Sequence, residues 1–169
     1  MAKKTKEECK SIFRQAREDM NLTREKASER LGLTSERIVR IESEEFRPYP
    51  DEVLRMAEGY KRPDLCNYFC SQVCDIGRQY VPQVSVAALS QIVLEILVAM
   101  NAASDKRDRL LNIAVDGVIH DDELEDFVHI QKELERISVS VEALQLWSEK
   151  MLATGKINLA KYNALMNKK

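Results

Sequence analysis

Residues 24–43, REKASERLGLTSERIVRIES, constrain the fold of this chain more than any other stretch. Thr23 precedes the stretch, and its hydroxyl can accept a hydrogen bond from a backbone amide that has no partner in the first turn of a helix. Gly32 can adopt the left-handed conformation that ends a helix at little steric cost. Thr34 can then cap a second helix. The pattern predicts two short helices joined by a tight turn.

We expect these two helices at about residues 24–31 and 35–43. Their inward side chains are expected to be Ala27, Leu31, Ile38 and Ile41, with Leu33 filling the turn. The outward positions of the second helix are Ser35, Glu36, Val39 and Arg40, with Arg37 at the flank. The second helix is therefore predicted to show a mainly polar outer side and to be held from beneath by two isoleucines.

Three further helices are expected nearby, at about residues 7–20, 51–60 and 64–74. Each carries apolar residues at the three- and four-residue spacing that places them on one side of a helix. These are Cys9, Ile12, Phe13, Ala16 and Met20, then Val53, Leu54 and Ala57, then Leu65, Tyr68, Phe69 and Val73. Pro48 and Pro50 disfavour a helix in the loop that carries Arg47. Residues 1–76 are therefore predicted to form a five-helix, all-α domain.

The chain changes character after an expected linker at residues 77–83. The run SVAALSQIVLEILVAMNAA is apolar on more than one side. One stripe consists of Leu89, Ile92, Ile96, Ala99 and Ala103, and a second, adjacent stripe consists of Val93, Leu97 and Met100. A helix this apolar must be covered on more than one side. We expect one cover to be a hairpin partner and the other to be a second copy of the chain.

The hairpin partner is expected as a long helix at about residues 121–153. Its apolar stripe keeps a three-four spacing through Phe127, Ile130, Leu134, Ile137, Val141, Leu144, Ser148 and Met151. This spacing is typical of coiled-coil-like packing. The β-branched run at 137–141 is a poor helix former and favours a kink or a break. Residues 84–169 are therefore predicted to form a helical dimerisation domain, with the homodimer contact in residues 84–153.

Composition and charge exclude several classes of protein. The chain has 169 residues, a net charge of −2, and only five glycines and four prolines, which favours long helices over a β-sandwich. There is no uncharged apolar run of about 18 residues and no apolar signal core at the N-terminus. We therefore expect a cytoplasmic protein with no membrane partner. There is no glycine-rich phosphate loop, nucleophile motif or catalytic pair, so we expect neither an enzyme nor a cofactor.

Three cysteines recur at four-residue intervals, at Cys66, Cys70 and Cys74. On a continuous helix this spacing places them along one stripe, as small buried hydrophobic residues. Two other roles for these cysteines stay open. One is a metal site completed by Cys9, and the other is redox sensing. The spacing matches neither the paired cysteines of zinc fingers nor a redox motif, so the main expectation is that no metal is bound.

Four groups of residues resemble the XRE/Cro family of phage-repressor helix-turn-helix domains, over about residues 8–73. They are Leu22-Thr23, Gly32-Leu33-Thr34, Ile38 with Ile41-Glu42, and Arg47-Pro48. The resemblance implies that the helix at 35–43 enters the major groove of double-stranded DNA. It implies that Thr34, Ser35, Glu36 and Arg40 face base edges, and that Arg24, Arg37 and Arg47 contact phosphates. It also implies a dimer on a two-fold operator.

The sequence thus predicts a DNA-binding transcriptional regulator that acts as a homodimer. An alternative is an interaction module, such as an adaptor or an antirepressor, that keeps the fold but binds protein. Two features favour the alternative, which are the acids at Glu42, Glu44 and Glu45 and the negative net charge. The excess of basic residues over residues 1–63 is only 15 against 13, whereas DNA affinity depends largely on neutralised phosphates.

Overall fold

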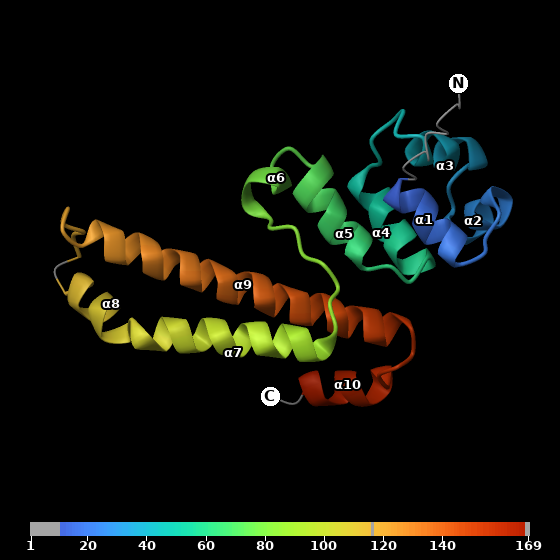
Figure 1. The fold of residues 1–169 in the computed structure, drawn as a ribbon. Helices are drawn as coiled ribbons and strands as arrows, with labels where there is room; N and C mark the ends of the chain where they lie inside the picture. The colour runs from blue at the N-terminus through green and yellow to red at the C-terminus, as the bar shows by residue number, and fades with distance from the viewer. Residues whose placement is uncertain (1–10, 116, 168–169) are drawn as a thin grey trace, which may run out of the picture. The chain divides into compact units, whose positions relative to one another are not determined.

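The structure is a computed structural model that describes residues 11–115 and 117–167, and the regular structure in these ranges is helical throughout (Figure 1). The all-α prediction is confirmed. The helices are α1 (Ile12–Asp19), α2 (Arg24–Leu31), α3 (Ser35–Glu42), α4 (Pro50–Gly59), α5 (Asp64–Tyr68), the π-helix η1 (Phe69–Val73), α6 (Gly77–Tyr80), α7 (Leu89–Asp105), α8 (Arg107–Ile113), α9 (Leu124–Ala153) and α10 (Leu159–Met166). The chain divides into two compact units, of which one is Val84–Glu149 and the other comprises the residues before and after it. Among the helices described, none combines the length and apolar character that crossing a bilayer requires.

Side-chain caps define the first helices of the first unit. The Thr23 hydroxyl accepts a hydrogen bond from the Lys26 amide at 3.3 Å, and the Thr34 hydroxyl accepts one from the Arg37 amide at 3.1 Å. Gly32 ends α2 with a φ of 63°. These three predictions are confirmed. Ser11 caps α1, which begins at Ile12, and the earlier part of the helix expected from residue 7 lies outside the described residues.

The core of the first unit gathers apolar side chains from α1 to α5. It consists of Phe13, Ala16, Ala27, Leu31, Leu33, Ile38, Ile41, Val53, Met56, Ala57, Tyr60 and Leu65. The prediction that Leu54 faces inward is wrong, because its side chain is 62% exposed. Met56 is fully buried in the same helix, so the buried side of α4 is formed by Val53, Met56 and Ala57.

The segment after α5 departs from the single helix predicted for residues 64–74. The helix widens into η1 and ends there, since Cys74 has extended backbone angles. Residues 77–80, expected to be part of a linker, form α6. Gly77 is buried, and a Cβ at this position would collide with the Cys70 carbonyl. This close approach of backbone to backbone keeps the end of η1 and the start of α6 together.

The second unit is a hairpin in which α7 and α9 run antiparallel (Figure 1). Near one end its core joins Val84 and Ile92 to Ala143 and Leu146. Near the turn, Arg109 donates a hydrogen bond to Asp126 at 2.7 Å. The pKa of Asp126 lies below its ordinary value because of this bond.

The expected break at residues 137–141 is wrong, because α9 continues through them. The Ser140 hydroxyl donates to the Arg136 carbonyl one turn earlier at 2.9 Å, which satisfies a polar group on the side of α9 that is buried. The predicted apolar stripe of α9 does not face α7 as a whole. Ile130 is buried, whereas Leu134 and Val141 are 49% and 41% exposed.

Candidate nucleic-acid interface

The helix α3 is fixed from beneath and open on its outer side. Ile38 and Ile41 are almost completely buried. Across the helix, the exposed positions are Thr34, Glu36, Val39, Arg40 and Ser43, and Ser35 is half-buried. A short helix that is anchored on one side and bare on the other can enter a groove about 12 Å wide. The four residues predicted to face base edges therefore lie on one accessible surface.

The last turn of α3 is held by a buried ion pair. Two nitrogens of Arg17 donate to the two carboxylate oxygens of Glu42, at 2.5 and 3.0 Å, and Arg24 Nε donates to Glu42 Oε2 at 3.0 Å. Arg17 also donates to the Leu22 carbonyl at 2.7 Å. The hydrogen bond to Glu42 raises the pKa of Arg17 above its ordinary value. One carboxylate thus ties α3 to both α1 and α2.

This arrangement corrects one expectation from the sequence. The sequence counts Glu42 with Glu44 and Glu45 among the acids that favour a protein-binding module, but the Glu42 side chain is only 2% exposed. The sequence carried a signal for this, because Glu42 follows Ile38 by four residues and therefore lies on its side of the helix. Arg17 follows Phe13 in the same way. Because Glu42 is buried and paired with Arg17, its charge is not on the surface, where it would repel a phosphate.

A second ion pair joins α3 to α4. Nε and Nη2 of Arg37 each donate to a carboxylate oxygen of Glu52 at 2.8 Å, and Nη2 also donates to the Arg47 carbonyl at 3.1 Å. The Arg37 hydrogen bond is the main reason that the pKa of Glu52 lies below its ordinary value. The Arg37 guanidinium lies 5.1 Å from the centre of the Tyr49 ring. Arg37 therefore holds the loop after α3 in place.

Arg40 lies on the open side of α3 with a weaker partner. Its Nη2 donates to Glu36 Oε1 at 2.7 Å, and the side chains are 45% and 75% exposed. The guanidinium lies 5.3 Å from the centre of the exposed Phe46 ring. An exposed ion pair one turn apart contributes about 0.3–0.5 kcal/mol, so Arg40 can leave Glu36 at little cost.

Arg24 and Arg47, the other arginines predicted to contact phosphates, differ in how firmly an acidic partner holds them. Arg24 bonds Glu42 through Nε, and its two Nη groups lie at the other end of the guanidinium. Arg47 is 68% exposed, and its Nη1 lies 3.5 Å from Asp75 Oδ1, a long and solvated contact. The Arg47 guanidinium is therefore accessible to solvent.

Val39 is a candidate contact that the predicted set omits. It lies on the outer side of α3 between Ser35 and Ser43, one turn away in each direction, and is 39% exposed. An apolar side chain in the major groove can pack against the methyl group of thymine. Helical periodicity in the sequence predicts this outward position, whereas the base contacts that the resemblance implies are all polar side chains.

The cysteines form no recognisable metal centre in the part of the chain that the structure describes. Neither residues 11–115 nor 117–167 contain a group of three His, Cys, Asp or Glu side chains arranged to hold a metal ion. The predicted single stripe is interrupted, because Cys70 lies in η1 and Cys74 follows its end. Cys74 Sγ accepts a hydrogen bond from the Gly77 amide at 3.5 Å. Cys9 lies outside the described residues.

Comparison with known families gives a match for the first part of the chain. The family described as Helix-turn-helix matches residues 13–64, which span α1 to α4. The resemblance to XRE/Cro domains is confirmed for these residues, and the C-terminal half matches no family. No curated protein and no solved structure matches the chain.

Proposed function

We propose, taking the helix-turn-helix domain at residues 13–64 as the premise, that this chain is a transcriptional regulator that places α3 in the major groove of double-stranded DNA. The observation that carries the proposal is the anchored but bare helix α3. Its inner side is buried through Ile38 and Ile41, while the side that would meet DNA is accessible along its whole length. Such a regulator acts where the DNA is, so a cytoplasmic location is part of the proposal.

Each outward residue of α3 has a role that fits its chemistry. Arg40 can bond guanine through two nitrogens, Ser35 and Thr34 can bond bases or phosphates, and Glu36 can accept from the cytosine amine. These residues would read sequence. Val39 would contact a thymine methyl group.

The flanking arginines would position the domain on the phosphate backbone. Arg47 is already accessible. Arg24 and Arg37 hold Glu42 and Glu52, so each would reach a phosphate only with the nitrogens that the carboxylate does not use. Each would then add less than one full positive charge to the interface.

We further propose that the regulator is a homodimer joined through residues 84–153. A single domain with few unpaired arginines would bind DNA weakly. Joining two such domains raises the effective concentration of the second at its half-site and so raises the affinity of the pair. The expected half-site spacing is about 34 Å or a multiple of it.

Fluorescence anisotropy with a labelled random duplex tests the DNA-binding proposal. At low salt the full chain should bind at micromolar concentration, and the logarithm of its affinity should fall linearly with the logarithm of salt concentration. Absence of binding at tens of micromolar would contradict the proposal. On a selected operator, Arg40→Ala should weaken binding by about 1–3 kcal/mol.

Arg55→Ala is the matched control for Arg40→Ala. Arg55 also pairs with an exposed acid one turn away, Asp51, at 2.6 Å, but lies on α4. Both changes remove one charge from an exposed ion pair, so an equal effect on operator binding would show that Arg40 acts only through net charge.

A protein-binding module is the second candidate. The observation that favours it is the surroundings of Arg40, where Glu36, Glu44 and Glu45 are exposed beside the exposed Phe46 ring. Protein interfaces are enriched in aromatic side chains, whereas DNA interfaces are strongly positive, so exposed acids beside an aromatic ring are less unfavourable against a protein than against DNA. A chain that shows no salt-dependent binding to duplex DNA would favour this candidate.

A further inference from the structure

One side of α7 is both apolar and exposed. Between residues 89 and 104 the only charged residue is Glu95. Even so, six large apolar side chains on this helix are 38% to 62% exposed, which are Leu89, Val93, Leu94, Leu97, Val98 and Met100. The hairpin alone therefore leaves about half of the circumference of α7 without a packing partner.

Helix geometry shows where the exposed rows lie. Successive residues turn by about 100° around a helix axis. On α7, Val93 and Met100 follow the buried row of Ile92 and Ala99 by roughly a quarter to a third of a turn. Leu97 follows the same row by about 150° and forms the outer edge of these exposed positions. On α9, Leu134 and Val141 follow the buried side by roughly a quarter turn.

The two rows fall on the same side of the hairpin. When both helices are viewed from the same end, rising residue number runs clockwise around one antiparallel helix and anticlockwise around the other. Each exposed row follows the buried side of its own helix, and the two buried sides face each other. Both rows therefore lie on the same side of the hairpin. We name this surface, consisting of Leu89, Val93, Leu97, Met100, Leu134 and Val141, the apolar side.

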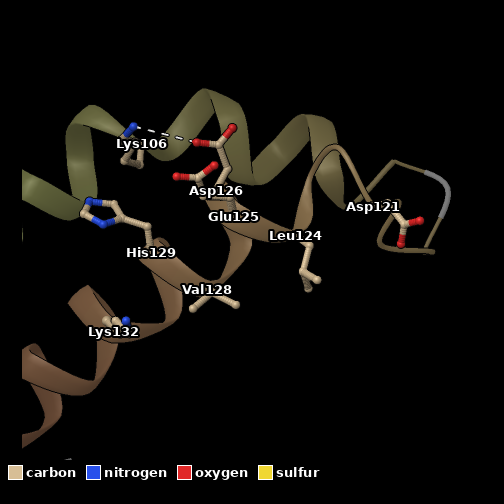
Figure 2. A pocket seen from close by; sticks show the side chains of 8 residues that line it. All are labelled: Lys106, Asp121, Leu124, Glu125, Asp126, Val128, His129 and Lys132. Atoms are coloured by element: carbon tan, nitrogen blue, oxygen red, sulfur yellow. Dashed lines mark ion pairs between the residues drawn. The ribbon is translucent and has the colours of Figure 1, made fainter.

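The opposite side of the hairpin carries charge. Figure 2 shows the side chains that line one hollow, which are mainly charged and include His129, with Lys106 paired to Asp126. The hollow has a volume of about 680 Å³, and Lys106 Nζ lies 3.9 Å from Asp126 Oδ1. A second hollow, of 530 Å³, is lined by Glu95, Glu135 and Arg136 among others. Lys132 lines both hollows. The hairpin thus carries these charged hollows on one side and the apolar side on the other, while the exposed Leu94 and Val98 lie between them on the outer side of α7.

We propose that a second copy of this chain packs on the apolar side, so that two hairpins form a four-helix bundle. This inference rests on the homodimer of the proposed function and names its surface. In a two-fold contact a patch meets its own copy, so like charges in the patch would repel each other. The apolar side contains none.

The dimensions of the apolar side suit such a contact. The 17 residues of α7 extend about 25 Å, and two helices side by side are about 20 Å wide, which gives a flat area of about 500 Å². Side chains enlarge this area when it is measured as accessible surface. Stable interfaces bury about 800 Å² on each partner, which is the same scale.

The spacing on α9 supports the same occupant. Leu134 and Val141 are seven residues apart, and Phe127, which is half-buried, continues the row by one more heptad. A parallel row of Ile130, Ile137 and Leu144 is buried or half-buried. A helix with two adjacent heptad rows can contact two neighbours at once, as helices in four-helix bundles do.

The mass of the full chain in solution tests the inference. Sedimentation equilibrium should give twice 19.4 kDa for the unchanged protein. Leu97→Glu and Leu134→Glu each put a charge into the apolar side and should yield monomers, with the dissociation constant raised at least about 100-fold. Gln91→Glu is the matched control, because it adds the same charge at an exposed position of α7 that lies about 100° before Ile92, away from the apolar side, and should leave the dimer intact.

The possible outcomes separate this inference from the proposed function. A dimer that survives both leucine changes, or that Gln91→Glu weakens equally, would overturn the assignment of the surface but not the homodimer. A monomeric unchanged protein would overturn both. Circular dichroism shows whether a glutamate variant has lost helix. If it has, Leu97→Ser takes its place and should raise the dissociation constant of the dimer at least about tenfold. An unchanged dissociation constant for Leu97→Ser would overturn the inference. DNA anisotropy is measured separately, so loss of DNA binding does not affect this result.

Discussion

Replacement of Glu42 by glutamine should destabilise the first unit by about 3–5 kcal/mol, the range measured when one partner of a buried ion pair is removed. This loss of stability is larger than for an exposed ion pair because both partners are buried. The side chains of Arg17 and Glu42 are 9% and 2% exposed, so water cannot solvate the Arg17 charge once Glu42 is neutral. Glutamine keeps the shape of the side chain but leaves the Arg17 guanidinium uncompensated. Arg24 is 39% exposed and should lose little.

Thermal unfolding followed by circular dichroism measures this effect. For a domain of this size 1 kcal/mol shifts the midpoint by about 4–8 °C, so Glu42→Gln should lower it by at least about 12 °C. Glu36→Gln, at the exposed start of the same helix, is the control and should change stability by less than about 0.5 kcal/mol. The double change Arg17→Met with Glu42→Leu should recover most of the loss, because apolar residues often replace a buried pair without cost. A midpoint for Glu42→Gln within about 2 °C of the unchanged protein would refute the argument.

Four further predictions concern single positions. Glu36→Gln should strengthen binding to a random duplex about twofold in anisotropy titrations, because Arg40 no longer has to leave a carboxylate. Replacing the contacted thymine of an operator by uracil should cost about 0.8 kcal/mol for the lost methyl group, and Val39→Ala should abolish that difference. The Arg37 hydrogen bond lowers the pKa of Glu52 in the folded chain. This bond therefore stabilises the fold at pH values above the ordinary pKa of 4.5, and the stabilisation is lost as the pH falls through the lower pKa of the folded chain. Glu52→Gln should flatten the decrease of melting temperature below about pH 5. Gly77→Ala should lower thermal stability by about 1–3 kcal/mol because its Cβ meets the Cys70 carbonyl.

Local signals in the sequence were enough to predict the helix-turn-helix. Thr23, Gly32 and Thr34 act through hydrogen bonds and backbone angles within a few residues of themselves, and Ile38 and Ile41 through simple periodicity. The accessible outer side of α3 follows from the same periodicity. These features need no knowledge of distant parts of the chain.

Features that depend on distant partners were missed. Glu42 is buried because Arg17, 25 residues earlier, supplies two donors, and no local rule pairs them. The helix widens into η1 and ends before Cys74, where Gly77 packs closely against Cys70, whereas helical spacing alone predicts an uninterrupted stripe of cysteines. Residues 137–141 stay helical because the packing of α9 outweighs the weak intrinsic preference of β-branched residues.

The apolar side of the hairpin also makes the proposed dimer sensitive to temperature. Burial of apolar area loses strength on cooling, whereas contacts to phosphate respond mainly to ionic strength. If a second copy covers Leu97 and Leu134, chilled protein will dissociate into single chains that keep their α3 surfaces but bind an operator one half at a time. Storage and assay in the cold would then report on a different species from the one present at growth temperature.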